Sequence, residues 1–371
     1  MIPRPVNVSS SRRQARAWVE VDLAAVVENA RTLARISGAR LLPVVKADAY
    51  GVGAVAVSRA LEALDPWGFA VATVDEGSAL RAAGISRPIL VFLPARPESF
   101  DDHRESRLTP TLGDAASISA WREVGPSERV AAFHLEIDTG MNRTGVRWDA
   151  IEPLAGLLDT PGLQGCFTQL HSADQQNDSA TVQLERFREA VGRLRRRPAL
   201  LHVANSAAAL RGPEFTADMI RPGMFLYGGH PADWLPTPRS VVALRARVCA
   251  VRRVTAGESV SYGASWVAPR TTTIATLPIG YADGLARGFG SGGGRVLVRG
   301  RSCPVVGVVT MDFAMVDLGD EAVGVGEVAT VIGGDGTGGA SITLPEVAAW
   351  SGLTQYQVLT NLGARLPRIY G

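Results

Sequence analysis

Short apolar runs recur along the first 230 residues, and this rhythm constrains the fold more than any other feature of the chain. The runs cover residues 41–45, 69–72, 89–93, 109–112, 131–137, 165–170, 200–203 and 224–227. Helical patterns separate most of them, for example at residues 54–64, 76–83, 115–123, 151–158 and 180–194. Apolar strands that alternate with amphipathic helices indicate a parallel sheet buried on both faces. Eight such units within roughly 200 residues predict a TIM (β/α)8 barrel.

The competing architecture is a doubly wound open sheet, but no GxGxxG motif follows the first strand, which counts against a Rossmann domain. Residues 18–22 alternate like a strand, and residues 23–36 have helical spacing with Asp22 as the expected N-cap. Residues 1–15 are expected to be flexible.

The pattern changes after about residue 240. Strand-like runs at 271–277, 295–298, 305–310, 315–318 and 328–332 are joined by glycine-rich turns, and helical patterns occur at 344–350 and 356–362. We therefore predict two domains, an α/β barrel over residues 1–240 and a smaller, mostly β domain over residues 241–371.

Composition excludes several classes of partner. The chain has 38 basic and 36 acidic residues, so there is no basic footprint for nucleic acid. Apolar runs stay shorter than the roughly 18 residues needed to cross a membrane, and the N-terminus lacks a signal-peptide core. Three widely spaced cysteines match no zinc pattern and predict a reducing, cytoplasmic setting without a metal site.

Lys46 ends the first predicted barrel strand. Such a lysine is either a solvated charge or a working amine, because burial or nearby positive charge lowers the pKa and the neutral amine forms Schiff bases. Active groups of TIM barrels lie at the C-terminal ends of the strands. The other strand ends carry Glu136, Asp138, Arg143, Gln169, His171, Asn205 and Ser206, while Arg221, Gly223 and Met224 lead into the predicted eighth strand.

Ser206 begins a helical segment near strands seven and eight, where this fold often binds phosphate. Its hydroxyl and the neighbouring N–H groups suit a phosphate cradle, although a plain N-cap is the alternative. A phosphate site opposite a strand-one lysine suggests pyridoxal phosphate (PLP).

The chain resembles the alanine racemase family, which is fold-type III among PLP enzymes, along nearly its whole length. The motifs that carry this resemblance are residues 44–51 (VVKADAYG), 138–145 (DTGMNRTG), 202–208 (HVANSAA), 221–228 (RPGMFLYG), 261–264 (SYGA), 278–284 (PIGYADG), 311–312 (MD) and 365–370 (RLPRIY). Each motif is weak alone, but their occurrence in this order is specific.

The resemblance implies a role for individual residues. Lys46 matches the Schiff-base lysine that moves the α-proton on one face, and Tyr262 matches the second acid/base, supplied by the other subunit of a homodimer. Further matches concern the cofactor: Tyr50, Ser206, Gly223, Met224 and Tyr356 near its phosphate, Arg143 at its phenolic oxygen and Arg221 at its pyridine nitrogen. Met311 and Asp312 match residues near the substrate carboxylate, also from the partner, and Tyr281 matches an entrance tyrosine.

Several positions depart from the family pattern. Glu136 stands where many relatives carry a lysine, often carbamylated, that positions the arginine matched by Arg143. We hypothesise that Glu136 supplies this negative charge directly. Gln169 replaces a histidine that supports the pyridine-facing arginine, and either Gln169 or His171 is a candidate for that task. Asp48, Val52, Val308 and Phe313 also differ from the family.

The sequence thus predicts a PLP-dependent amino-acid racemase that works by two-base proton transfer, with alanine as the first substrate to test. Alternatives are a racemase for serine, a basic amino acid or several amino acids, a fold-type III decarboxylase, and a PLP-binding protein without catalysis. The residues around Tyr262 and Met311 favour a racemase over a decarboxylase.

Overall fold

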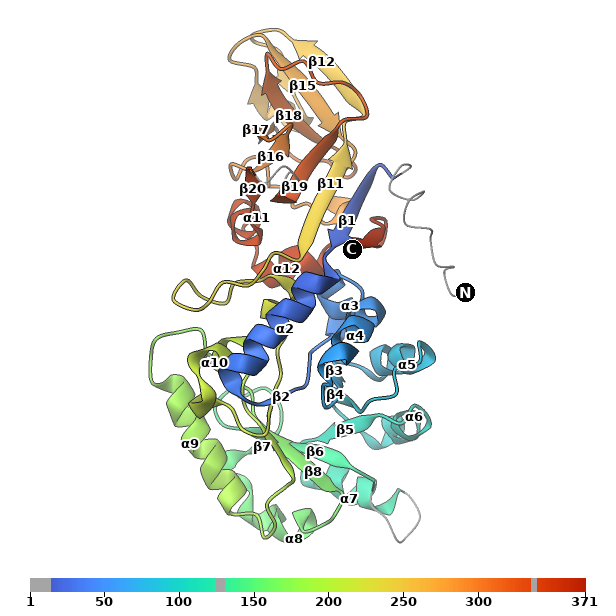
Figure 1. Ribbon diagram of the computed structural model, residues 1–371, viewed down its shortest axis with the longest axis vertical. Helices are drawn as coiled ribbons and strands as arrows, with labels where there is room; N and C mark the ends of the chain where they lie inside the picture. The colour runs from blue at the N-terminus through green and yellow to red at the C-terminus, as the bar shows by residue number, and fades with distance from the viewer. Residues whose placement is uncertain (1–14, 125–130, 335–338) are drawn as a thin grey trace.

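The computed structural model describes residues 15–124, 131–334 and 339–371. A barrel occupies one end of the molecule and a β-rich part the other (Figure 1). Residues 1–15 were expected to be flexible, and residues 1–14 of this segment lie outside the described ranges. Within the described part, no helix is both long enough and apolar enough to cross a bilayer.

Eight parallel strands form the barrel, as predicted. They are β2 (Arg40–Leu41), β3 (Phe69–Val71), β4 (Ile89–Pro94), β5 (Thr109–Leu112), β6 (Phe133–Asp138), β8 (Leu163–Phe167), β9 (Leu200–His202) and β10 (Met219–Ile220). The strand β10 pairs with β2, and a bridge between Val44 and Ala70 closes the ring toward β3. A short strand, β7 (Val146–Arg147), adds to β6.

Helices cover the outside of the barrel (Figure 1). They are α2 (Leu23–Ser37), α4 (Ala54–Leu61), α5 (Val74–Ala82), α6 (Phe100–Glu105), α7 (Ala115–Glu123), α8 (Ala155–Leu158), α9 (Ser179–Gly192) and α10 (Ser206–Arg211). Asp22 caps α2 as predicted, because its side chain accepts a hydrogen bond from the N–H of Ala25. Thr73 and Glu76 form a capping box at the start of α5.

The predicted position of the eighth strand is wrong. Residues 224–227 form a 3₁₀ turn, η6 (Met224–Tyr227), and the strand lies earlier, at Met219–Ile220. All four residues of η6 are buried, so none of them needs to be polar. A run without a polar face has no periodicity that distinguishes a buried turn from a buried strand. Arg221, Gly223 and Met224 therefore follow the strand and do not lead into it, which places them at the catalytic end of the barrel.

The second part of the chain is mostly β, also as predicted. Its main sheet contains β11 (Val242–Arg247), β12 (Ala250–Val254), β15 (Thr272–Leu277), β16 (Arg295–Val298), β17 (Arg301–Val306), β18 (Ala314–Gly319), β19 (Val328–Gly334), β20 (Ser341–Ile342) and β21 (Arg368–Tyr370). A separate hairpin pairs β13 (Ser259–Val260) with β14 (Trp266–Val267). Two helices, α11 (Leu344–Ser351) and α12 (Gln355–Thr360), lie between this sheet and the barrel (Figure 1).

The first strand of the chain belongs to this second sheet. β1 (Ala17–Val21) is antiparallel to β11 and parallel to β21. Residues 17–21, which the sequence grouped with the barrel domain, therefore complete the C-terminal sheet. The boundary near residue 240 remains our proposal for where the chain leaves the barrel.

Candidate active site

A cavity of about 1000 Å³ opens where the C-terminal ends of the barrel strands meet α11 and α12. Its walls combine residues from the ends of the barrel strands with residues from the α11–α12 region. Among the predicted site residues, those that line it are Lys46, Tyr50, Glu136, Arg143, Gln169, His171, Ser206, Arg221, Gly223, Met224 and Tyr356. Residues from five separate stretches of the barrel sequence, and Tyr356 from α12, thus converge on one site.

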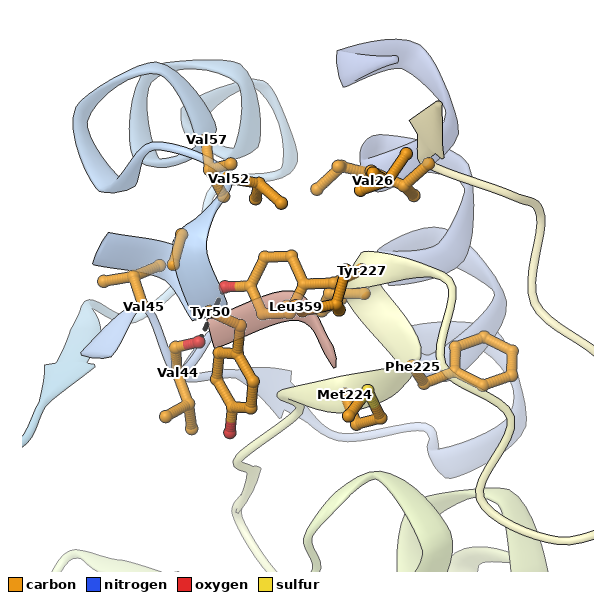
Figure 2. Close-up of a cluster of buried hydrophobic side chains, with 14 of the residues drawn as sticks. Val26, Val44, Val45, Tyr50, Val52, Val57, Met224, Phe225, Tyr227 and Leu359 are labelled. Atoms are coloured by element: carbon orange, nitrogen blue, oxygen red, sulfur yellow. Dashed lines mark hydrogen bonds between the residues drawn. The ribbon is translucent and has the colours of Figure 1, made fainter. Parts of the chain in front are cut away.

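The backbone in front of Lys46 is fixed from three sides. The N–H of Val44 donates to the carbonyl of Pro222 (2.8 Å), and the N–H of Val45 donates to that of Ala70 (2.8 Å). The buried hydroxyl of Tyr227 donates to the carbonyl of Val44 at 2.7 Å, as Figure 2 shows. These bonds tie the segment that leads from β2 to Lys46 to its two neighbouring barrel segments and to η6.

A left-handed turn follows Lys46. Residues 47–50, within α3 (Lys46–Gly51), all have φ between 50° and 58°. None of them is glycine, so the surrounding structure must hold this conformation. Glu76 accepts from the N–H of Ala47 (2.7 Å), and Asp48 accepts from that of Ala54 (2.7 Å). Asp48 is thus a structural cap for the segment after the turn, whereas Val52 is fully buried in the core.

The pKa of Lys46 is lowered, first by burial and then by the positive charge of Arg143. Arg221 lowers it further, and the carboxylate of Glu76 opposes these effects. Lys46 therefore yields a neutral amine at lower pH than a solvated lysine does. A lowered pKa is what the working-amine alternative requires, so it favours that alternative over a solvated charge.

The guanidinium of Arg221 is buried in the barrel mouth, with 4% exposure. Its Nη1 donates to the carbonyl of His202 (2.6 Å), and its Nη2 donates to those of Thr168 (2.6 Å) and Val203 (3.1 Å). The side-chain oxygen of Gln169 also accepts from Nη2 at 3.3 Å. The bonds of Arg221 to described residues all use Nη1 and Nη2, so Nε is the nitrogen left for a ligand.

Of the two candidates for supporting Arg221, the structure brings Gln169 into contact with it. Among the described residues, the hydrogen bonds of His171 go to Ser172 and to Gln183. Residue 169 follows directly on the strand end, whereas His171 already lies in the loop, where strand alternation no longer applies. Sequence reasoning assigned no role to His202, whose Nδ1 lies 3.2 Å from Nη1 of Arg221.

Ser206 is not the N-cap of α10. Asn205 takes that position and accepts from the N–H of Ala208 (3.0 Å). The hydroxyl of Ser206 instead accepts from the N–H of Gly223 at 2.9 Å, so it faces the segment that follows β10. A Cβ atom at Gly223 would lie 2.5 Å from the hydroxyl oxygen of Tyr50, so any side chain here would displace the ring of Tyr50.

Two tyrosines lie near this end of the cavity. The ring of Tyr50 is 4.8 Å from that of Tyr227 and 6.0 Å from that of Tyr356. Burial raises the pKa of Tyr50, and Tyr356 raises it further, so the hydroxyl of Tyr50 keeps its proton and is able to donate a hydrogen bond.

The loop after β6 presents Arg143 to the cavity. Asp138 shapes this loop, because its carboxylate accepts from the N–H groups of Gly140 (2.9 Å) and Asn142 (3.1 Å). Glu136 is 5% exposed, and one of its carboxylate oxygens has no described partner. Burial raises the pKa of Glu136, opposed by a hydrogen bond with Thr144 and by the charges of Arg143 and Arg221. Within the described ranges, neither a hydrogen bond nor an ion pair joins Glu136 to Arg143.

Four predicted site residues lie elsewhere, on the C-terminal part of the chain. Tyr262 (73%), Met311 (53%) and Tyr281 (44%) are exposed, whereas Asp312 is half-buried. None of the four is among the described residues that line the cavity. The loop that carries Tyr262 is attached near Met311, because Ser261 donates to the carbonyl of Val308 (2.7 Å). One chain therefore holds these four residues together but away from its own Lys46 cavity.

Asp312 is held by an ion-pair network. Arg365 donates to Asp312 (2.9 Å) and to the fully buried Asp283 (3.0 Å). Arg16 also pairs with Asp283 at 2.6 Å. The partners of Asp283 thus come from the two ends of the chain, which local spacing does not reveal.

Together, these features define an α/β barrel whose cavity at the strand ends holds one lysine amine and a buried guanidinium. Two family models match the chain: "Alanine racemase, N-terminal domain" over residues 21–231 and "Alanine racemase, C-terminal domain" over residues 241–370. An alanine racemase of Symbiobacterium thermophilum is 41% identical over 368 residues, which cover 95% of this chain and 97% of that protein. The chain therefore belongs to the alanine racemase family and is a racemase.

Solved structures agree. The alanine racemase of Bartonella henselae, described with covalently bound pyridoxal phosphate, matches with a TM-score of 0.87 and 29% identity, covering 96% of this chain and 100% of that one. A histidine racemase from Leuconostoc mesenteroides also has a TM-score of 0.87, at 27% identity, covering 96% and 98%. The fold is thus shared by racemases of different substrates.

Proposed function

We propose that this protein racemises alanine with pyridoxal phosphate, using Lys46 of one subunit and Tyr262 of a second copy as its two proton-transfer groups. The observation that carries this proposal is the cavity in which the amine of Lys46, Arg143, Arg221 and Ser206 converge. The full-length similarity to alanine racemases makes alanine the first substrate.

The residues present fit the cofactor. Lys46 would bind it covalently, and Ser206, Gly223, Met224, Tyr50 and Tyr356 would hold its phosphate. The absence of a side chain at Gly223 leaves its backbone open beside the hydroxyls of Tyr50 and Ser206. When bound, the cofactor supplies an electron sink that makes the α-proton of an attached amino acid acidic.

Arg221 would face the ring nitrogen, and Arg143 the phenolic oxygen. Burial lowers the pKa of Arg221 to about 10, so its guanidinium remains charged at neutral pH. A guanidinium only donates hydrogen bonds, so it favours an unprotonated ring nitrogen. This limits the electron demand of the ring, and it therefore disfavours side reactions such as transamination.

Racemisation removes the α-proton on one face and returns a proton on the other, so two groups must flank the reacting carbon. Lys46, whose pKa is lowered, takes or gives the proton on its own face. The exposure of Tyr262 and its distance from its own cavity support a homodimer in which the partner's Tyr262 serves the other face. Met311, Asp312 and Tyr281 would arrive with it and contact the substrate carboxylate and the entrance.

A second candidate substrate is a basic amino acid. The carboxylates of Glu136 and Asp174 both line the cavity, and a histidine racemase shares the fold. Serine, or several amino acids, is the broader version of this alternative. We further propose that the enzyme works in the cytoplasm, since its three cysteines are all free.

A racemisation screen tests the proposal. The purified protein, loaded with pyridoxal phosphate, is incubated with L-Ala, L-Ser, L-His, L-Lys or L-Arg, and the enantiomers are separated by chiral chromatography. We expect D-Ala to form fastest and Lys46→Ala to form none. Faster turnover of a basic amino acid would replace alanine as the substrate. Cofactor binding without any isomerisation would indicate a carrier and reject the proposal.

A further inference from the structure

Behind Arg221, two histidines are sealed inside the barrel. His202 and His134 are both 0% exposed, and neither belongs to the cavity wall. Nε2 of His202 lies 2.8 Å from Nδ1 of His134, and Nδ1 of His202 lies 3.2 Å from Nη1 of Arg221. Nε2 of His134 in turn lies 3.4 Å from the side-chain oxygen of Gln164. Four side chains thus form a line that leads away from the site.

The chemistry of the donors gives this line a direction. A guanidinium carries donors only, so Nδ1 of His202 must be unprotonated and accept from Arg221. A neutral His202 then carries its proton on Nε2 and donates it to Nδ1 of His134. His134 therefore carries its own proton on Nε2 and donates to Gln164, whose amide must present its oxygen.

Both imidazoles are neutral, as this assignment requires. Burial lowers the pKa of His134 to about 4, with a further decrease from Arg221 that the bond to Gln164 opposes. Burial, Arg221 and His134 together lower the pKa of His202 well below its usual value. A proton added to either ring would place two donors face to face in the line.

We propose that His202, His134 and Gln164 form a one-directional hydrogen-bond chain that fixes the orientation of Arg221, which makes His134 and Gln164 positioning residues for the site. The inference rests on the proposed function only in that it takes Arg221 as the group that faces the cofactor. Each imidazole turns an unprotonated nitrogen toward the arginine, so the chain supports the guanidinium charge. It also leaves Nε of Arg221 as the donor for the ligand.

Packing holds the rings in place. A Cβ atom at residue 165 would lie 2.7 Å from the ring of His134, so Gly165 provides the room for this imidazole. The ring of Phe167 stacks on His202 at 5.0 Å and lies 5.2 Å from the guanidinium carbon of Arg221. The positions of both rings are therefore set by contacts that do not involve any ligand.

The tautomers are measured directly in the holoenzyme. Protein labelled with ¹⁵N at its five histidines gives long-range ¹H–¹⁵N correlation patterns that distinguish the two neutral tautomers and the imidazolium. His134→Asn removes one pattern and thereby assigns it. We expect the Nε2–H tautomer for both His134 and His202 at neutral pH. An Nδ1–H tautomer or an imidazolium at either residue would overturn the proposal.

Kinetics of three variants measure the positioning. His134→Leu removes the acceptor for His202, and we expect kcat to fall about tenfold while KM changes less. His134→Asn keeps an acceptor at the place of Nδ1, so it should recover most of that loss. The matched control is His103→Leu, since His103 of α6 is equally buried (1%) but bonds to the carbonyl of Ser99, just before that helix. Its kcat should remain at the wild-type value.

The outcomes of these experiments separate the positioning role of the hydrogen-bond chain from the proposed racemase function. Equal impairment of the Asn and Leu variants at residue 134, or an unimpaired His134→Leu, would reject the chain as a positioning device. The tautomer measurement needs no turnover, so it remains decisive if the substrate is not alanine. Conversely, a wild-type protein with the expected tautomers but without racemase activity would reject the proposed function alone.

Discussion

Arg368 anchors the left-handed turn that follows Lys46, and its replacement by lysine should disrupt both stability and catalysis. Its guanidinium donates to the carbonyl of Gly51 through Nε (2.9 Å) and Nη2 (2.8 Å). It also donates to the carbonyls of Leu362 (2.6 Å), Gly363 (2.6 Å) and Leu366 (2.7 Å). One side chain from β21 thus joins the end of the turn to the segment after α12.

The structure allows the effect to be estimated. Four consecutive left-handed residues cost roughly 4–8 kcal/mol, at about 1–2 kcal/mol each. A hydrogen bond from a charged group contributes about 1.5–3 kcal/mol. The ammonium of a lysine lacks the planar fork of arginine and cannot serve four carbonyls. Arg368→Lys should therefore destabilise the protein by about 3 kcal/mol, the equivalent of one or two such bonds.

Calorimetry of the holoenzyme and steady-state kinetics provide the assay. We expect the thermal midpoint to fall by roughly 5 °C and kcat to fall more than KM rises, because the turn positions Lys46. Arg122→Lys is the control, since among the described residues the guanidinium of Arg122 makes one exposed bond, to the carbonyl of Leu157 at 3.0 Å. If Arg368→Lys behaved like this control in both assays, the proposed role of Arg368 in holding the turn would be refuted.

Three further changes test the electrostatics. Glu136→Gln removes the buried negative charge beside Arg143 and should lower kcat/KM, while bicarbonate should not affect the wild type; full activity of the variant would refute the charge hypothesis. Glu76→Gln removes the charge that raises the pKa of Lys46, so apoprotein should capture pyridoxal phosphate optimally at lower pH than wild type does. Burial acts to raise the pKa of Asp283, but bonds from Arg16 and Arg365 lower it overall. The stability from this carboxylate is therefore complete above about pH 4 and is lost as pH falls through the lowered pKa. Calorimetry should show a smaller loss of thermal midpoint on acidification for Asp283→Asn than for wild type, and equal losses would contradict this assignment.

Much of the fold is predictable because apolar strands and amphipathic helices alternate with distinct periods. The boundaries of α7 are those expected, and its N-cap, Asp114, accepts from the N–H of Ser117. The misplaced eighth strand shows the limit of this signal. A fully buried 3₁₀ turn has no polar face, so Met224–Tyr227 carries no periodicity that separates it from a strand.

The barrel site is predictable for a simple geometric reason: parallel strands bring their C-terminal ends to one mouth of the barrel. Contacts made across the barrel are not predictable in this way. The left-handed turn at residues 47–50 contains no glycine or asparagine that would reveal it in the sequence. Contacts from Glu76 and Arg368 hold this turn. The choice of Gln169 over His171, and the pairing of His134 with His202, likewise depend on contacts between separate strands.

A mixed dimer tests the central claim most directly. Lys46→Ala and Tyr262→Phe are each expected to be inactive as racemases, and the two purified variants are unfolded together and refolded with pyridoxal phosphate. If each site takes Lys46 from one subunit and Tyr262 from the other, a mixed dimer holds one intact site and one doubly defective site. Random assembly at equal concentrations should then restore about one quarter of the activity of wild type refolded in the same way. Failure to recover any activity from verified mixed dimers would contradict the shared two-base site.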